Sequence, residues 1–163
     1  MTRYRIAVVC MGNICRSPIA DIVLRAKLDQ AGLATRASVE SFGTGGWHRG
    51  EPMDSRAAAT LREAGYDGSA HRARQINSAH LSGPLPGFDL VLAMDRDNKA
   101  DLIRLGHTGK AAIALFRDFD PTNPGADVPD PYYGGLDGFE EVLRMVERTA
   151  DVLVARLAAG TLP

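Results

Sequence analysis

Cysteine is scarce in this sequence, and charge of neither sign is in excess. Only Cys10 and Cys15 occur among 163 residues, too few for a secreted disulfide scaffold or for a structural zinc site. The formal net charge is −1, so the chain carries no electrostatic footprint for nucleic acid or for a membrane surface. Two neighbouring thiols in a reducing compartment therefore need an explanation other than a disulfide framework or a bound metal.

Long hydrophobic runs are also missing near the N-terminus. Ile6–Val9 is the apolar run that precedes Cys10, and it is too short for a signal peptide or a membrane span. We expect a cytoplasmic protein with no nucleic-acid or membrane partner, while export by a route without a signal peptide stays open. Hydrophobic residues make up 45% of the chain, which is enough to fill the core of one domain covering residues 1–163.

Short apolar runs alternate with helical patterns along the chain. Runs rich in β-branched residues predict strands at residues 6–9, 37–41, 88–93 and 111–116. Apolar spacings of three and four, with capping residues and glycine stops, predict helices at residues 17–32, 54–65, 95–105 and 138–159. This alternation predicts a single-domain α/β fold, an open four-stranded parallel sheet with helices on both faces. Ligands of such sheets bind beyond the carboxyl ends of the strands, so the loop after the first strand is the first candidate site.

That loop places a thiol, an arginine and a hydroxyl at the start of a helix. It consists of Cys10, Met11, Gly12, Asn13, Ile14, Cys15, Arg16 and Ser17. If the loop curls round a point, its backbone N–H groups form a nest for an anion, and Gly12 and Asn13 suit the left-handed backbone of such a nest. The guanidinium of Arg16 matches two phosphate oxygens, and the helix N-terminus adds positive potential. In these surroundings we expect Cys10 to be substantially ionised, and a thiolate that faces a bound phosphate is a nucleophile.

The segment Val9–Pro18 resembles the phosphate-binding loop of the low-molecular-weight protein tyrosine phosphatase family. The resemblance covers nearly the whole chain, because it continues in the family's order through Ser41–His48, His71–Gln75, Ala93–Asp95 with Asn98, and Asp130–Gly134. It implies a four-stranded parallel sheet flanked by helices. It also implies hydrolysis of phosphotyrosine in proteins in two steps, without a metal or other cofactor, and inhibition by phosphate and other oxyanions.

The resemblance assigns roles to the reacting groups. It makes Cys10 the nucleophile, Arg16 the phosphate clamp beside the N–H groups of the loop, and Asp130 the general acid and then the general base. One carboxyl can serve both steps, and Pro131 keeps Asp130 out of the α region. The dipeptide Asp120-Pro121 has the same pattern, but we expect it to form a turn after the fourth strand.

Further residues support the loop by the same resemblance. Asn13 and Ser17 hold the shape of the loop and hydrogen-bond the sulfur of Cys10. Ser41 and His71 match positions that brace Asn13 from behind. A single histidine is most often a structural residue, and that reading agrees with the supporting role expected here.

Aromatic residues are expected to line the substrate pocket. Tyr132 and Tyr133 adjoin the acid, and Trp47 and His48 lie on the facing loop. A deep slot between aromatic faces accepts a phosphotyrosine ring and leaves phosphoserine too short to reach the thiol. In the family, the equivalent of Cys15 closes a reversible disulfide with the nucleophile and protects it from deeper oxidation. A small buried residue with no redox role is an equal alternative for Cys15.

Other functions on the same fold stay open. A thioredoxin-coupled arsenate reductase relays a disulfide through further cysteines, and the chain has none after Cys15. A thiol-dependent arsenate reductase, a protein arginine phosphatase and a noncatalytic phosphotyrosine-binding module remain as alternatives. Ile14 and the pair Tyr132 and Tyr133 favour phosphotyrosine over phosphoarginine, and the presence of both a nucleophile and an acid favours catalysis over binding alone.

Overall fold

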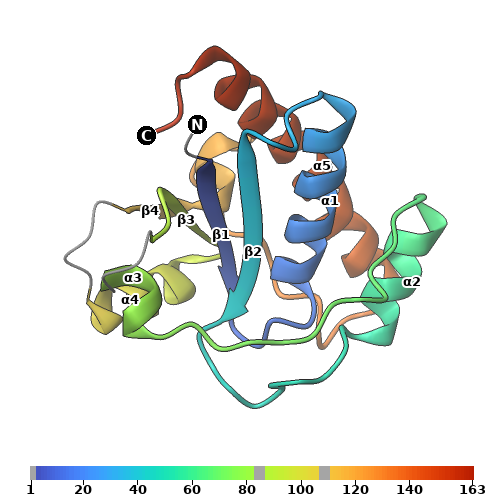
Figure 1. The fold of residues 1–163 in the computed structure, drawn as a ribbon. Coiled ribbons are helices and arrows are strands. Elements are labelled where there is room, and N and C mark those ends of the chain that lie inside the picture. Colours follow the sequence, from blue (N-terminus) through green and yellow to red (C-terminus); the bar gives the residue numbers. More distant parts are fainter. Residues whose placement is uncertain (1–2, 83–86, 107–110) are drawn as a thin grey trace.

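The chain is built on a four-stranded parallel sheet (Figure 1). A computed structural model describes residues 3–82, 87–106 and 111–163. The strands are β1 (Tyr4–Cys10), β2 (Ala37–Gly43), β3 (Leu90–Ala93) and β4 (Ala112–Leu115). They lie in the order β2-β1-β3-β4, and every pairing is parallel, so the carboxyl ends of all four strands meet at one edge of the sheet.

Strand β1 is central, and its side chains enter two separate cores. Ile6 and Val8 belong to the larger core, with apolar residues of α1 (Arg16–Gln30), α2 (Ser55–Glu63) and α5 (Leu136–Ala159). Ala7 and Val9 belong to the smaller core, with residues of α3 (Ser78–Ser82) and α4 (Arg96–Leu105). Alternate residues of a strand point to opposite faces, so helices cover both faces of the sheet and the predicted fold is confirmed (Figure 1).

Helix α5 shows how the apolar pattern produces the packing. Its apolar residues recur at spacings of three and four, which places them on one side of the helix. The buried members of this set include Phe139, Val142, Leu143, Val146, Ala150, Leu153 and Leu157. They fill the larger core, and the opposite side of α5 carries charged residues that face solvent.

The start of α1 differs from the prediction. The pattern predicts a helix that begins at Ser17 with a side-chain cap, but the helix begins at Arg16, and Cys15 occupies the cap position without a side-chain hydrogen bond. The Ser17 hydroxyl is engaged inside the preceding loop instead. Two smaller differences are that Phe116–Phe119 forms a 3₁₀ helix rather than the end of a strand, and that α3 is too short to leave a periodic pattern.

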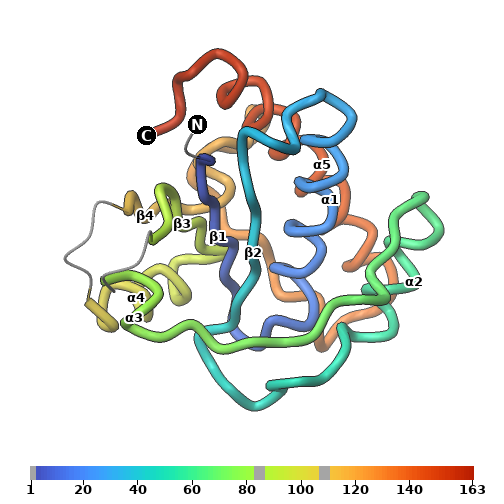
Figure 2. The backbone as a smooth tube through the Cα atoms, in the orientation of Figure 1, coloured from blue at the N-terminus to red at the C-terminus, as the bar shows by residue number. Residues whose placement is uncertain are grey.

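Loops gather at the edge where the strands end (Figure 2). The loop after β1, the loop of residues 44–54 after β2 and the segment of residues 120–135 before α5 all reach this edge (Figure 2). The start of β1 and the C-terminus lie near each other at the opposite edge, where the Tyr4 hydroxyl donates to the carbonyl of Pro163. Among the helices of the described ranges, none has the length and apolar character needed to cross a membrane. The chemistry-bearing residues of the sequence therefore converge on one side of the molecule.

Candidate active site

The Cys10 loop, which we define as residues 10–17, turns sharply between β1 and α1. Asn13 makes the turn, with a φ of 58°. Its backbone N–H donates to the Cys10 sulfur over 3.3 Å, so the chain curls back on the thiol. Gly12 does not share the left-handed conformation, contrary to the prediction. A Cβ at this position would lie 3.1 Å from the imidazole of His48, so that ring would have to shift by a few tenths of an ångström.

Asn13 is held from the side opposite the thiol. Its side-chain oxygen accepts the backbone N–H of Arg74 over 2.8 Å, and its backbone carbonyl lies 2.7 Å from Nε2 of His71. Burial lowers the pKa of His71, so the neutral ring carries its proton on Nε2 and donates it to that carbonyl. The structure thus places His71 behind the loop, where it fixes the orientation of the Asn13 peptide.

The Ser17 hydroxyl connects the loop to β2. It accepts the side-chain amide of Asn13 over 2.8 Å and lies 3.0 Å from the Cys10 sulfur. It also lies 3.2 Å from the backbone carbonyl of Phe42, to which it donates. Because three partners surround one hydroxyl, Ser17 is unavailable as a helix cap, which explains the earlier start of α1.

Ser41, expected to brace Asn13, contacts Asp21 and Arg74. Its side chain is hydrogen-bonded to the buried carboxyl of Asp21, whose pKa is raised by burial. Its backbone carbonyl accepts Nη2 of Arg74 over 3.3 Å, and the backbone N–H of Arg74 is the group that reaches Asn13. Ser41 therefore reaches the loop through Arg74.

Arg16 projects from the first turn of α1 and is only 3% exposed. Its Nη1 donates to the carboxylate of Asp95 over 2.6 Å and to the backbone carbonyl of Val128 over 3.1 Å. Its Nη2 lies 3.5 Å from the carboxylate of Asp130. Burial opposes the charge, but the Cys10 sulfur and Asp95 together raise the pKa of Arg16, so the guanidinium remains a cation beside the thiol.

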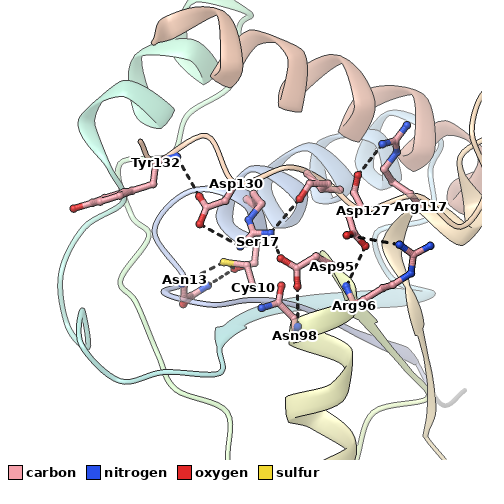
Figure 3. A network of polar contacts seen from close by, with 12 residues as sticks. Cys10, Asn13, Ser17, Asp95, Arg96, Asn98, Arg117, Asp127, Asp130 and Tyr132 are labelled. Carbon is pink, nitrogen blue, oxygen red and sulfur yellow. Dashed lines mark hydrogen bonds and ion pairs between the residues drawn. The ribbon is translucent and has the colours of Figure 1, made fainter. Parts of the chain in front are cut away.

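Asp95 is the residue of this site that pattern reasoning missed. Its Oδ1 accepts the backbone N–H of Asn98 and caps α4, while its Oδ2 holds Arg16 (Figure 3). The sequence pattern predicts only a helix start at residue 95. A usable signal was present, because an acidic residue directly after a buried strand lies at the carboxyl edge of a parallel sheet, beside the loop of the neighbouring strand.

Asp130 faces the Cys10 loop from the segment before α5 (Figure 3). Its Oδ1 accepts the backbone N–H of Tyr132 over 3.1 Å, which leaves Oδ2 directed toward Arg16. The rings of Tyr132 and Tyr133 meet edge to face with their centroids 4.9 Å apart. Tyr133 is 88% exposed and Trp47 is 71% exposed, so these rings stand at the mouth of the site rather than in a core.

A single cleft of about 340 Å³ joins these groups. Its lining is formed by Cys10, Met11, Gly12, Ile14, Cys15, Arg16, Trp47, His48, Asp130, Tyr132 and Tyr133. The residues predicted as nucleophile, clamp, acid and aromatic walls are therefore brought together. Of the predicted supporting residues, Asn13 and Ser17 lie within the loop and Ser41 and His71 lie behind it. Within the part of the chain that the structure describes, no group of three or more His, Cys, Asp or Glu side chains is placed to hold a metal ion.

The two thiols differ in their surroundings. Both are buried and free, and Cys15 stands at the N-cap position of α1 and lines the cleft. Burial raises the pKa of Cys15 well above its ordinary value, and the nearby carboxylate of Asp54 raises it further. Cys15 therefore stays a protonated thiol at neutral pH, whereas Cys10 receives an N–H and lies beside the Arg16 cation.

The fold and the site together define a class of protein. An open parallel sheet ends its central strand in a thiol, and the next residues bring a backbone N–H, a helix N-terminus and a buried arginine close to that sulfur, an arrangement suited to an anion. A carboxylic acid faces this anion site across the cleft. This arrangement suits a class of protein that would bind an oxyanion directly against a cysteine.

Comparisons with known proteins identify the family within that class. The family model for low molecular weight phosphotyrosine protein phosphatase matches residues 5–161. A low molecular weight protein-tyrosine-phosphatase of Streptomyces coelicolor is 47% identical over 93% of this chain and 92% of that protein. Low molecular weight protein-tyrosine phosphatase A of Mycobacterium tuberculosis is 43% identical over 85% of this chain and 82% of that protein.

A solved structure agrees with the sequence comparisons. The crystal structure of a protein tyrosine phosphatase from Entamoeba histolytica matches with a TM-score of 0.85 at 32% identity, over 98% of this chain and 99% of that one. The chain belongs to the low molecular weight phosphotyrosine protein phosphatase family.

Proposed function

We propose that this protein hydrolyses phosphotyrosine in protein substrates through a phosphoryl-cysteine intermediate. The observation that carries the proposal is the single cleft in which the Cys10 sulfur, the Arg16 guanidinium and the Asp130 carboxyl face one another. The names of the relatives from Streptomyces coelicolor and Mycobacterium tuberculosis, both protein-tyrosine phosphatases, support this substrate class.

In the first step, the Cys10 thiolate attacks the phosphorus atom of the bound ester. The S–P bond forms and the P–O bond to the tyrosine breaks, so the electron pair of that bond goes to the tyrosine oxygen. Asp130, in its acid form, gives its proton to this oxygen, and tyrosine leaves as a neutral phenol. Arg16 and the N–H groups of the Cys10 loop stabilise the equatorial oxygens of the transition state.

In the second step, water takes the place of the departed tyrosine. The Asp130 carboxylate accepts a proton from the water as its oxygen attacks phosphorus, and the S–P bond breaks to return the Cys10 thiolate. Inorganic phosphate is released. Phosphate and similar oxyanions therefore compete with the substrate for Arg16 and the N–H groups of the Cys10 loop. Asp130 ends the cycle protonated and ready for the next ester.

The shape of the cleft favours an aryl phosphate. The rings of Tyr132, Tyr133 and Trp47 stand around its mouth, and the thiol lies at its buried end. A tyrosine ring spans this depth while stacking against the aromatic walls, whereas a phosphoserine side chain is shorter and has no ring to stack. His48, which also lines the cleft, is held by Glu51 with 2.7 Å between Nδ1 and Oε2.

Cys15 acts as the redox partner of the nucleophile within this proposal. Peroxide oxidises the Cys10 thiolate to a sulfenic acid, and the Cys15 thiol then displaces water to form a disulfide that a thiol reductant reopens. Replacement of Cys15 by Ser leaves the sulfenic acid open to further oxidation. We therefore expect the wild type to recover fully after mild peroxide and reductant, and Cys15→Ser to recover incompletely; full recovery of the variant would contradict this role.

A substrate panel tests the proposed function. Phosphate release is measured from a phosphotyrosine peptide, a phosphoserine peptide and an arginine-phosphorylated peptide, and arsenate reduction is followed in the presence of thiol. We expect turnover of the phosphotyrosine peptide with competitive inhibition by phosphate, and loss of turnover in Cys10→Ser with retained phosphate binding. Preference for phosphoarginine or arsenate, or binding without turnover in the wild type, would replace the proposal with one of its alternatives.

A further inference from the structure

One arginine of α2 holds the segment that carries the acid. We define the acid loop as residues 130–134. Arg56 Nη2 donates to the backbone carbonyl of Tyr132 over 2.9 Å, and Arg56 Nη1 donates to the backbone carbonyl of Gly134 over 3.3 Å. The guanidinium also lies 5.6 Å from the centroid of the Tyr132 ring. Three contacts from a single side chain thus bind the acid loop.

The guanidinium of Arg56 is itself fixed in place. Its Nε and Nη2 donate to the carboxylate of Asp54 over 3.0 and 2.9 Å, a two-pronged contact that sets the plane of the group. The guanidinium also packs on the buried ring of Phe139, with its Cζ 4.7 Å from the ring centroid. The Arg56 side chain therefore connects α2, α5 and the acid loop.

Asp54 connects Arg56 to the Cys10 loop. Its backbone N–H donates to the carbonyl of Ile14 over 2.9 Å, while its carboxylate caps α2 and holds Arg56. Backbone and side chain of one residue thus face the two halves of the site. Asp54 and Arg56 thus form one connection between the loop that carries the thiol and the acid loop, beside the ion pair of Arg16 with Asp130.

The residue that Arg56 holds, Tyr132, also contacts the carboxyl of Asp130. The N–H of Tyr132 holds Oδ1 of Asp130, and the carbonyl of the same residue accepts from Arg56. The other hold on Asp130 is the ion pair with Arg16, whose donors a bound phosphate shares. While phosphate is bound, the Tyr132 backbone and the arginine behind it keep the carboxyl in place.

We propose that Arg56 is a positioning residue for the general acid, and that it acts on the reaction through the Tyr132 peptide and Asp130. Its hydrogen bonds are made to the acid loop and to Asp54, so we expect its loss to disturb protonation of the leaving group and to spare phosphate binding. The inference rests on the proposed function, in which Asp130 supplies that proton.

The test compares two leaving groups in four proteins. Values of kcat/KM are measured for para-nitrophenyl phosphate, whose leaving group departs readily, and for phenyl phosphate, whose leaving group needs a proton. The proteins are the wild type, Arg56→Met, Asp130→Ala and the double variant. Arg62→Met is the matched control, because Arg62 lies on the same helix with an exposed side chain and the substitution removes the same charge.

A general acid contributes about 10²–10⁴-fold, and a misplaced one loses part of this, so we expect Arg56→Met to lower kcat/KM for phenyl phosphate about tenfold. For para-nitrophenyl phosphate we expect a loss below about threefold, with the inhibition constant of inorganic phosphate unchanged. In the Asp130→Ala background the arginine substitution should cost less than about twofold, because two residues that act through one group are not additive. Arg62→Met should match the wild type on both esters.

The outcomes separate this inference from the function on which it rests. An equal loss on both esters, or a tenfold loss that persists in the Asp130→Ala background, would assign Arg56 a general structural role and overturn the inference. A normal Arg56→Met enzyme beside a strongly impaired Asp130→Ala enzyme would also overturn it and leave the proposed function intact. If Asp130→Ala itself is unimpaired on phenyl phosphate, the general acid is misassigned. That result would contradict both the inference about Arg56 and the role of Asp130 in the proposed function.

A second variant covers the case in which Arg56→Met does not fold. Arg56→Lys keeps the charge and the aliphatic stem but lacks the planar fork that spans Asp54 and the two loop carbonyls. We expect it to fold with unchanged phosphate inhibition and to show the same selective loss on phenyl phosphate, smaller than that of Arg56→Met. Wild-type kcat/KM on both esters would contradict the proposal.

Discussion

Gly43 ends β2 directly beneath the Cys10 loop, and its replacement by Ala is a sharp test of how closely the loop is fitted. A Cβ built at this position lies 2.7 Å from the carbonyl oxygen of Met11 and 3.1 Å from the backbone nitrogen of Asn13. Gly43 cannot retreat, because its N–H donates to the carbonyl of Arg74 over 2.7 Å and its own carbonyl accepts the N–H of Ile76 over 2.9 Å. The Cys10 loop must therefore move.

The size of that movement follows from the contact distances. Ordinary contact begins at 3.4 Å, so the Met11 carbonyl has to shift by about 3.4 − 2.7 = 0.7 Å. A misplacement of about 1 Å costs on the order of 10² in rate, so we expect Gly43→Ala to lower kcat/KM by about tenfold to a hundredfold. Overpacking of this kind costs about 1–3 kcal/mol, which lowers the melting temperature by about 2–12 °C.

The assay measures kcat/KM for para-nitrophenyl phosphate, inhibition by inorganic phosphate and the melting temperature. Gly87→Ala is the control, because a Cβ there lies 3.6 Å from the carbonyl of His80, an ordinary contact remote from the cleft. We expect the control to match the wild type, and Gly43→Ala to lose phosphate affinity together with rate. A Gly43→Ala enzyme that keeps both within about twofold would refute the close fit between β2 and the loop.

Three further predictions follow from other contacts. Asp120 is buried with its pKa held low, chiefly by Arg148 and also by Arg117, so its ionised form stabilises the fold at pH 7. We expect Asp120→Asn to lower the free energy of unfolding in urea by about 3 kcal/mol at pH 7. The wild type should lose this stabilisation only as the pH falls below about 4, the range in which an unfolded aspartate binds a proton. Equal stability of the two proteins at pH 7 would contradict the ion pair. Iodoacetamide at pH 7 should spare Cys15, whose pKa burial raises, and peptide mapping that finds Cys15 as the main labelled residue would contradict this. Asn13 has a φ of 58°, which alanine adopts less readily than glycine. The free energy of unfolding in urea should therefore be about 1 kcal/mol lower for Asn13→Ala than for Asn13→Gly, although both lose the same side-chain hydrogen bonds.

Much of the fold was predictable because its causes are local. The apolar run Ile6–Val9 is buried on both faces of a parallel sheet, and the spacing of apolar residues along α5 matches the stripe that it buries. The start of α1 was not predictable from capping preferences, because the hydroxyl of Ser17 is claimed by Asn13, Cys10 and the carbonyl of Phe42, two of them within the same loop and one on β2. Such a competition exists only once the chain has folded.

The candidate site also has one part that could be predicted from the sequence and another that could not. The loop from Cys10 to Ser17 is contiguous in sequence, so its chemistry could be predicted from residue types and spacing. Asp95 comes from a distant segment and holds Arg16 through its carboxylate, and only its place after a buried strand gave a signal. Arg56 acts through backbone carbonyls, which carry no residue signature. The carbonyl of Val128, which holds Arg16, could be supplied by any amino acid and is invisible before the structure.

Rapid-quench mass spectrometry of the Asp130→Ala variant, mixed with para-nitrophenyl phosphate, whose leaving group departs without a proton from Asp130, tests the central proposal most directly. Loss of the general base slows hydrolysis of the intermediate, so the phosphoryl group should accumulate on the enzyme. We expect the peptide that contains Cys10 and Cys15 to gain the mass of one phosphoryl group, with fragmentation placing it on Cys10, and we expect Cys10→Ser to gain none. Turnover without a labelled Cys10, or continued turnover in Cys10→Ser, would contradict catalysis through a phosphoryl-cysteine.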